Sequence, residues 1–132
     1  MKLHHVGVAV DDLEAAIELY TTTFGAELTH RASNEKDGQA AAFLRAGDAE
    51  VELLMPLHEH MDTPVGKFLA KRGPGLHHIA IAVSDIDQAI AEARANGMEM
   101  IDQEPRIGLH GTRIAFVHPK SVGGVLTEFV ET

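Results

Sequence analysis

The chain has 132 residues, of which 45% are hydrophobic and none is cysteine, and its formal net charge is −9. This length fits one compact domain, the lack of thiols excludes disulfides and thiolate metal sites, and the acidity argues against nucleic-acid binding, which needs a basic face. No apolar run is long enough to span a membrane and the start has no secretory signal profile, so we expect a cytoplasmic protein without a membrane partner.

The first 57 residues predict the order strand, helix, strand, strand, strand. Residues 3–10 alternate in side-chain size, which is typical of a strand. Asp11-Asp12 can cap the helix that follows, whose apolar residues recur at helical spacing until Gly25. Three further strands are expected over residues 26–31, 40–45 and 50–55, with a polar turn at 33–38 between the first two.

The same order returns after a joining segment at 58–74, in which a short helix is expected over 65–71. The second set comprises a strand at 76–83, a helix at 86–96, a strand at 98–102, a glycine-rich loop at 105–111, and strands at 112–118 and 125–130. We therefore predict a single domain with module one at 1–57, a linker helix at 58–74 and module two at 75–132. Runs of strands around helices indicate an α+β fold. Two tandem βαβββ modules could pair into a half-open eight-stranded barrel.

The two modules begin with the same phrase. Residues 3–10 read Leu-His-His-Val-Gly-Val-Ala-Val and return at 76–83 as Leu-His-His-Ile-Ala-Ile-Ala-Val. Over residues 3–17 and 76–90, eight of fifteen positions are identical. Such a repeat indicates two copies of one supersecondary unit, so a histidine that acts in one copy has a partner in the other.

Strand alternation separates the histidines of each phrase. His5 and His78 share a strand face with glycine and alanine, where a ligand would have room, whereas His4 and His77 share the face of the bulky residues and are expected to pack or hydrogen-bond. A single histidine on a strand is more often structural than a ligand. Its return in the same register of a repeat favours the ligand interpretation.

Two carboxylates show a related symmetry. Glu52 and Glu128 each stand within an otherwise apolar strand near the end of their modules. Burying an unpaired carboxylate is costly, and one divalent cation shared with His5 and His78 would neutralise both charges. Alternatively, both carboxylates face solvent. Glu50 lies two residues before Glu52, and therefore on the same face of the strand, which would allow this interpretation. Two imidazoles and two carboxylates suit one Zn²⁺, Co²⁺, Ni²⁺ or Mn²⁺ and leave coordination positions open for substrate oxygens.

These phrases, with residues 51–57, 67–79 and above all 105–126, resemble the vicinal-oxygen-chelate (glyoxalase-like) superfamily and, within it, the methylmalonyl-CoA epimerases. The resemblance runs from Leu3 to Glu131. It implies that His5, Glu52, His78 and Glu128 are the metal ligands. It also implies a catalytic acid/base pair of Glu128 and a carboxylate in the loop before the third strand, for which Glu35 is the nearest match and Asp37 the alternative.

The resemblance implies interconversion of (2R)- and (2S)-methylmalonyl-CoA through an enolate, and a homodimer. Ethylmalonyl-CoA is a further candidate substrate. Four cations are candidates to meet the phosphates of the acyl-CoA substrate, or else are ordinary surface charges: Lys71, Arg72, Arg106 and Lys120.

Three other functions remain open at this stage. A glyoxalase I-type lactoylglutathione lyase would use the same four ligands, and the 105–126 segment argues against it. A ring-cleaving dioxygenase needs an iron site of two histidines and one carboxylate, whereas Glu52 here fills a fourth position. A metal-free binding protein would not need four competent ligands.

Overall fold

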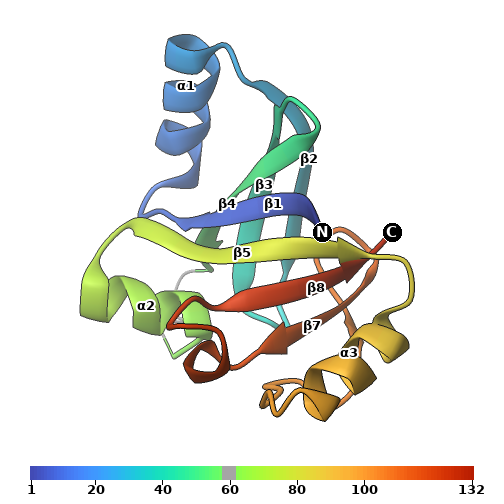
Figure 1. The fold of residues 1–132 in the computed structure, drawn as a ribbon. Helices are drawn as coiled ribbons and strands as arrows, with labels where there is room; N and C mark the ends of the chain where they lie inside the picture. The colour runs from blue at the N-terminus through green and yellow to red at the C-terminus, as the bar shows by residue number, and fades with distance from the viewer. Residues whose placement is uncertain (58–61) are drawn as a thin grey trace. The chain divides into compact units, whose positions relative to one another are not determined.

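The computed structural model describes residues 1–57 and 62–132, so the first part of the predicted linker helix, 58–61, lies outside the described residues. Its elements are β1 (Lys2–Ala9), α1 (Leu13–Phe24), β2 (Glu27–Asn34), β3 (Gln39–Ala46), β4 (Ala49–Pro56), α2 (Pro64–Arg72), β5 (Gly75–Val83), α3 (Ile86–Ala95), β6 (Arg106–Ile107), β7 (Arg113–Val117), the 3₁₀ helix η1 (Pro119–Ser121) and β8 (Thr127–Glu131). The strands are hydrogen-bonded in the order β2-β3-β4-β1-β5-β8-β7-β6. The predicted α+β class with two tandem βαβββ modules is confirmed (Figure 1).

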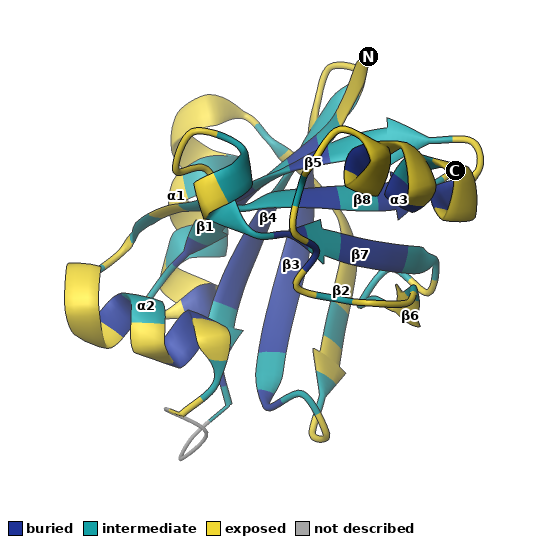
Figure 2. Ribbon diagram, turned by 60° about the horizontal axis from the view of Figure 1, so that its bottom comes forward, coloured by how far each residue is buried: buried dark blue, intermediate teal, exposed yellow. Residues whose placement is uncertain are grey.

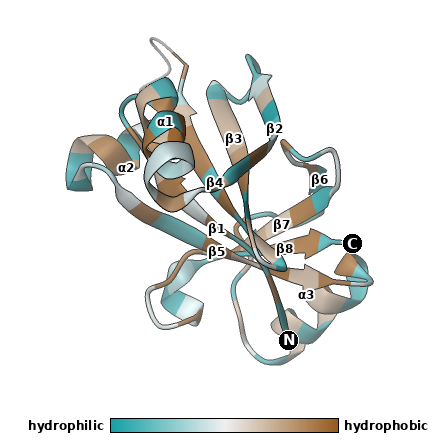
Figure 3. Ribbon diagram, turned by 90° about the horizontal axis from the view of Figure 1, so that it is seen from above, coloured by the Kyte–Doolittle hydropathy of each residue, from teal (hydrophilic) through white to brown (hydrophobic). Residues whose placement is uncertain are grey.

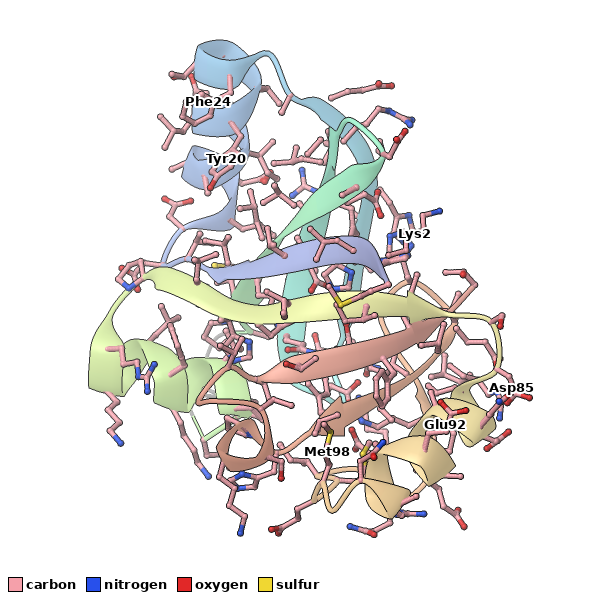
Figure 4. The ribbon with its side chains drawn as sticks, in the orientation of Figure 1. Lys2, Tyr20, Phe24, Asp85, Glu92 and Met98 are labelled. Atoms are coloured by element: carbon pink, nitrogen blue, oxygen red, sulfur yellow. The ribbon has the colours of Figure 1, made fainter. Side chains whose placement is uncertain are left out.

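The chain forms two compact units, the middle unit, Val6–His77, and the terminal unit, Met1–His5 with His78–Thr132. In the middle unit, α1 packs on β3 and β4 through a core that includes Leu13, Leu44 and Leu53. The helix carries both hydrophobic and hydrophilic residues (Figure 3), and the rings of Tyr20 and Phe24 meet edge to face near its end at 5.5 Å (Figure 4). As predicted, Gly25 ends the helix, with a φ of 66° that favours glycine.

In the terminal unit, α3 packs on β7 and β8 (Figure 2). The shared core includes Ile86, Ile90 and Val117. The two long helices start alike, because the Asp12 and Asp85 carboxylates each accept a hydrogen bond of 3.0 Å from the backbone N–H three residues later. The repeat therefore extends to helix capping. Among the described residues, no helix is long and apolar enough to cross a membrane.

The predicted strand at 98–102 is wrong, because the pairing there is reduced to a single bridge between Met100 and Val117. The Ile101 N–H donates to the Phe116 carbonyl at 2.8 Å, but the Phe116 N–H donates to the Asp102 carboxylate, also at 2.8 Å, instead of to a backbone carbonyl. A side chain thus takes the place that would continue the ladder. Pairing resumes at β6, within the segment predicted as a loop.

The end of β8 is tied to α3 by a cluster of charges. Arg113 donates to Glu131 through Nε at 3.0 Å and Nη2 at 2.9 Å, and to Asp87 through Nη1 at 3.1 Å. The Ile86 N–H also donates to Glu131, at 3.0 Å. The Arg113 guanidinium, followed by the Ile86 N–H, holds the pKa of Glu131 below its ordinary value of 4.5.

We expect Glu131→Gln to lower the melting temperature at neutral pH, and we expect this difference to shrink as the pH is lowered from neutral into the acid range through the depressed pKa of Glu131. Because the folded pKa of Glu131 is depressed, its stabilisation is complete above the unfolded pKa and is lost as the pH falls through the folded value. Thermal denaturation of both proteins across this range measures the difference. The control is Glu104→Gln, at an exposed carboxylate of the same unit. A gap between Glu131→Gln and wild type that is independent of pH would contradict the prediction.

Gly108 lies close to the core side chain Ile114. A Cβ at this position would stand 2.9 Å from Cδ1 and 3.0 Å from Cγ2 of Ile114, which is itself buried. We expect Gly108→Ala to destabilise the fold by about 1–3 kcal/mol through overpacking. Chemical denaturation measures this, with Gly75→Ala as the control because a Cβ there meets nothing within 4 Å. Equal losses in the two variants would show that steric contact with Ile114 is not the cause.

Candidate metal centre

Strand alternation turns His5 and His78 inward. Along β1 the buried positions are His5, Gly7 and Ala9, and along β5 they begin with His78 and Ala80. The predicted faces are therefore confirmed. Each imidazole is 4% exposed, so a polar ring has been taken out of water beside small neighbours.

Glu128 reaches the same place from β8. It pairs with Ala80 of β5 on one side and with Phe116 of β7 on the other, and it is 5% exposed. Because β8 is flanked by both strands, the backbone at Glu128 is held by two ladders. The sheet register of the terminal unit thus brings together side chains from positions 5, 78 and 128.

The potential ligand atoms of these three residues face one another. His5 Nε2 lies 3.1 Å from His78 Nε2 and 3.1 Å from Glu128 Oε1, and His78 Nε2 lies 3.8 Å from the same oxygen. The two rings meet at 85° with their centroids 5.2 Å apart. Two ring nitrogens and one carboxylate oxygen therefore converge inside the terminal unit.

This donor set fits a divalent cation. Nitrogen and oxygen ligands about 2.1 Å from one ion, at angles of about 90–110°, stand roughly 3.0–3.4 Å apart. Glu128 Oε1 is buried and, among the described residues, accepts no aligned hydrogen bond, although His5 Nε2 is 3.1 Å away. Two ligand atoms of one metal ion lie in this way, close together but without a hydrogen bond between them.

Glu52, the fourth predicted ligand, lies on β4 in the middle unit. It is 6% exposed, is followed by the buried Leu53 and Leu54, and pairs across the ladder with Phe43. The alternative interpretation, in which Glu52 and Glu128 face solvent, is therefore wrong. A carboxylate at this depth needs a counter-charge or hydrogen-bond donors to be tolerated.

The aromatic ring of Phe116, which was not predicted from the sequence, packs beside His78. The Phe116 ring meets His78 at 5.4 Å and 83°, and the Arg106 guanidinium lies over the same ring at 5.7 Å. Arg106 Nε also donates to the Asp102 carboxylate at 3.0 Å. The Asp102 carboxylate thus ends the backbone ladder at Phe116 and also holds the Arg106 guanidinium over the Phe116 ring. The available signal in the sequence was Asp102, a carboxylate that follows Met100 and Ile101 at the end of the predicted strand.

The four candidate phosphate-binding cations differ in their surroundings. Lys120 forms an ion pair with Glu99, and its ammonium lowers the pKa of that carboxyl. Arg72, in the last turn of α2, lies over the Phe68 ring at 5.6 Å, and Lys71 beside it is exposed. Among the described residues, Arg106 has a carboxylate only at Nε, so its terminal nitrogens are available to an anion.

Glu35 lies in the turn between β2 and β3, at the tip of a hairpin in the middle unit, and is exposed. Asn34 shapes this turn, since its side-chain oxygen accepts hydrogen bonds from the N–H groups of Lys36 and Asp37. The Asp37 carboxylate accepts a bond from the Asn34 amide at 2.9 Å. Asp37 is therefore bound within the turn, and the choice of Glu35 as the second acid/base stays a prediction.

Comparison with known proteins identifies the family. Residues 4–116 match the family described as the glyoxalase/bleomycin resistance protein/dioxygenase superfamily. The chain is 38% identical over 129 residues to the ethylmalonyl-CoA/methylmalonyl-CoA epimerase of Cereibacter sphaeroides, covering 96% of this chain and 95% of that protein. The chain belongs to the methylmalonyl-CoA epimerase family.

Solved structures of this family share the fold. The crystal structure of methylmalonyl-CoA epimerase from Mycobacterium tuberculosis has a TM-score of 0.92 at 41% identity, covering 98% of this chain and 87% of that one. A variant of the Streptomyces coelicolor epimerase, in complex with 2-nitronate-propionyl-CoA, has the same TM-score and identity over 100% and 97%. The lactoylglutathione lyase of Escherichia coli O157:H7 is only 28% identical over 117 residues, covering 89% and 84%, which favours the epimerases over the lyase alternative.

Proposed function

We propose that this protein interconverts the two epimers of methylmalonyl-CoA, using one divalent cation and two carboxylates. The observation that carries the proposal is the convergence of His5, His78 and Glu128 within 3.1–3.8 Å, in a buried place and in a chain of the epimerase family. We propose Glu52 as the fourth ligand, because it is buried on the strand of module one that corresponds to the Glu128 strand of module two.

The substrate explains why such residues are needed. Its α-carbon stands between a thioester carbonyl and a carboxylate, and loss of the α-proton places negative charge on the thioester oxygen. When bound, a divalent cation supplies positive charge beside that oxygen. The buried setting of the ligands keeps the interaction strong, since few water molecules can screen it.

Two carboxylates on opposite faces of the planar enolate complete the reaction. In one direction, Glu128 takes the α-proton and Glu35, as the carboxylic acid, delivers a proton to the opposite face; in the other direction the roles exchange. The two residues end each turnover with exchanged protonation states and reset through solvent. Glu128 Oε1 faces the imidazoles, so we assign the proton to Oε2.

The phosphates of CoA are assigned to Arg106 first, with Lys71, Arg72 and Lys120 as further candidates.

Hydrogen exchange from solvent tests this function. One epimer of methylmalonyl-CoA is incubated in D₂O with protein reconstituted with Co²⁺, Ni²⁺, Mn²⁺ or Zn²⁺, and with protein treated with EDTA. We expect metal-dependent deuteration at the α-carbon with inversion. NMR measures the deuteration and chiral analysis measures the inversion. Absence of exchange with every ion would overturn the epimerase function, and hemithioacetal substrates would then test the lyase alternative. The most active ion would indicate which metal the protein uses.

Three further expectations stay predictions. The homodimer expected from the family resemblance can be measured by analytical ultracentrifugation. The cytoplasmic location can be measured by cell fractionation, and the human relative, 37% identical over 128 residues, is named as mitochondrial. Turnover of ethylmalonyl-CoA is proposed because the Cereibacter relative is named for both substrates.

A further inference from the structure

His4, the residue before the first proposed ligand, contacts that ligand directly. Its Nδ1 lies 2.7 Å from Nδ1 of His5, within the terminal unit. Adjacent residues of a strand point to opposite faces, so strand geometry alone does not produce this contact. The two rings turn toward each other, at 76° with their centroids 5.0 Å apart.

We propose that His4 is a positioning residue, which holds His5 in the tautomer that binds the metal ion. The inference rests on the proposed metal centre and goes beyond its ligands to the group that orients one of them. A neutral imidazole carries one N–H, and the nitrogen that binds a metal must lack it. His5 Nε2 faces His78 and Glu128. In the metal-loaded protein, the proton of His5 therefore lies on Nδ1.

The proton on His5 Nδ1 needs an acceptor, and the nearby Nδ1 of His4 supplies one. His5 then donates to His4, whose own proton lies on Nε2. Hydrogen bonds of this kind fix the rotation of a ligand ring and increase its basicity. The acceptor here is a second imidazole, which adds no negative charge to a centre that already has two proposed carboxylate ligands.

A third histidine ring lies against His4 itself. The His110 ring meets the His4 ring at 90° with a centroid separation of 5.9 Å. His110 stands in a loop closed by two backbone hydrogen bonds, from the Gly108 N–H to the Thr112 carbonyl at 2.9 Å and from the Gly111 N–H to the Gly108 carbonyl at 3.0 Å. The acceptor His4 thus packs against a residue of a hydrogen-bonded loop, as is expected of a positioning residue.

Metal affinity tests this inference without reference to activity. His4→Phe keeps a ring of similar size and removes the acceptor, whereas His4→Asn places an amide oxygen near the position of Nδ1. We expect His4→Phe to weaken Zn²⁺ binding by about 10–100-fold, measured by competition with a chromogenic chelator. His4→Asn is expected to stay within about 3-fold of wild type. The control is His30→Phe, on the edge strand β2, which should leave the affinity unchanged.

NMR of ¹⁵N-histidine in the Zn²⁺-loaded wild type reads the tautomers directly and does not depend on the variants folding. We expect a proton on Nδ1 of His5 and on Nε2 of His4. A proton on Nδ1 of His4, or equal Zn²⁺ affinity in His4→Phe and wild type, would overturn this inference and leave the epimerase function intact. A wild-type protein that binds no divalent ion would overturn the proposed metal centre together with it.

Discussion

Glu128→Gln is expected to lower the epimerisation rate by at least about 10³-fold, because one residue is proposed both to bind the cation and to transfer the proton. An amide oxygen is a weak ligand and no base. The rate is measured as inversion of one epimer by NMR. The control is Glu92→Gln, at an exposed carboxylate on α3 labelled in Figure 4.

The stability of Glu128→Gln separates a catalytic loss from a folding loss. Glu128 is buried, and its Oε1 lacks a hydrogen bond among the described residues. Without metal, removal of this charge is expected to leave the melting temperature unchanged or to raise it, because an uncompensated buried carboxylate destabilises the fold. A variant that loses activity and also melts well below the metal-free wild type would show a structural role. Full activity would remove Glu128 from the mechanism.

Glu35→Gln is expected to reduce inversion by about 10²–10⁴-fold. The loss should be stereochemically selective, because the Glu128 carboxylate, which is proposed to act on one face of the enolate, remains in the variant. In D₂O, the epimer that presents its proton to Glu128 should exchange hydrogen for deuterium without inverting. The other epimer should neither exchange nor invert. NMR with each pure epimer measures both outcomes.

Asp37→Asn is the matched control for Glu35, because it changes a carboxylate in the same turn. Its oxygen is bonded within the turn by Asn34, so we expect turnover close to that of wild type. If Asp37→Asn instead shows the selective loss, Asp37 is the second acid/base. If Glu35→Gln inverts both epimers at the wild-type rate, Glu35 has no part in the reaction.

The sequence by itself determined the repeat, the order of the elements and the inward faces of His5 and His78. These features depend on local physics: alternation in a strand, helical spacing and the capping of α1 and α3 by Asp12 and Asp85 each act over a few residues. The polar turn at Glu35 was predicted for the same reason. The burial of Glu52 and Glu128 could be predicted only in part, because an apolar strand with one carboxylate is compatible with either exposure.

Only the tertiary structure decided which atoms meet. His5 and His78 are 73 positions apart, and their 3.1 Å approach depends on the pairing of whole strands. Asp102 replaced a backbone acceptor with its side chain and so ended a strand that the apolar pattern had predicted. The contact between His4 and His5 depends on side-chain rotamers, and the His110 ring, from a distant part of the sequence, lies against His4. Hydrogen-bond partners are chosen from everything that the fold brings near, which a local pattern does not contain.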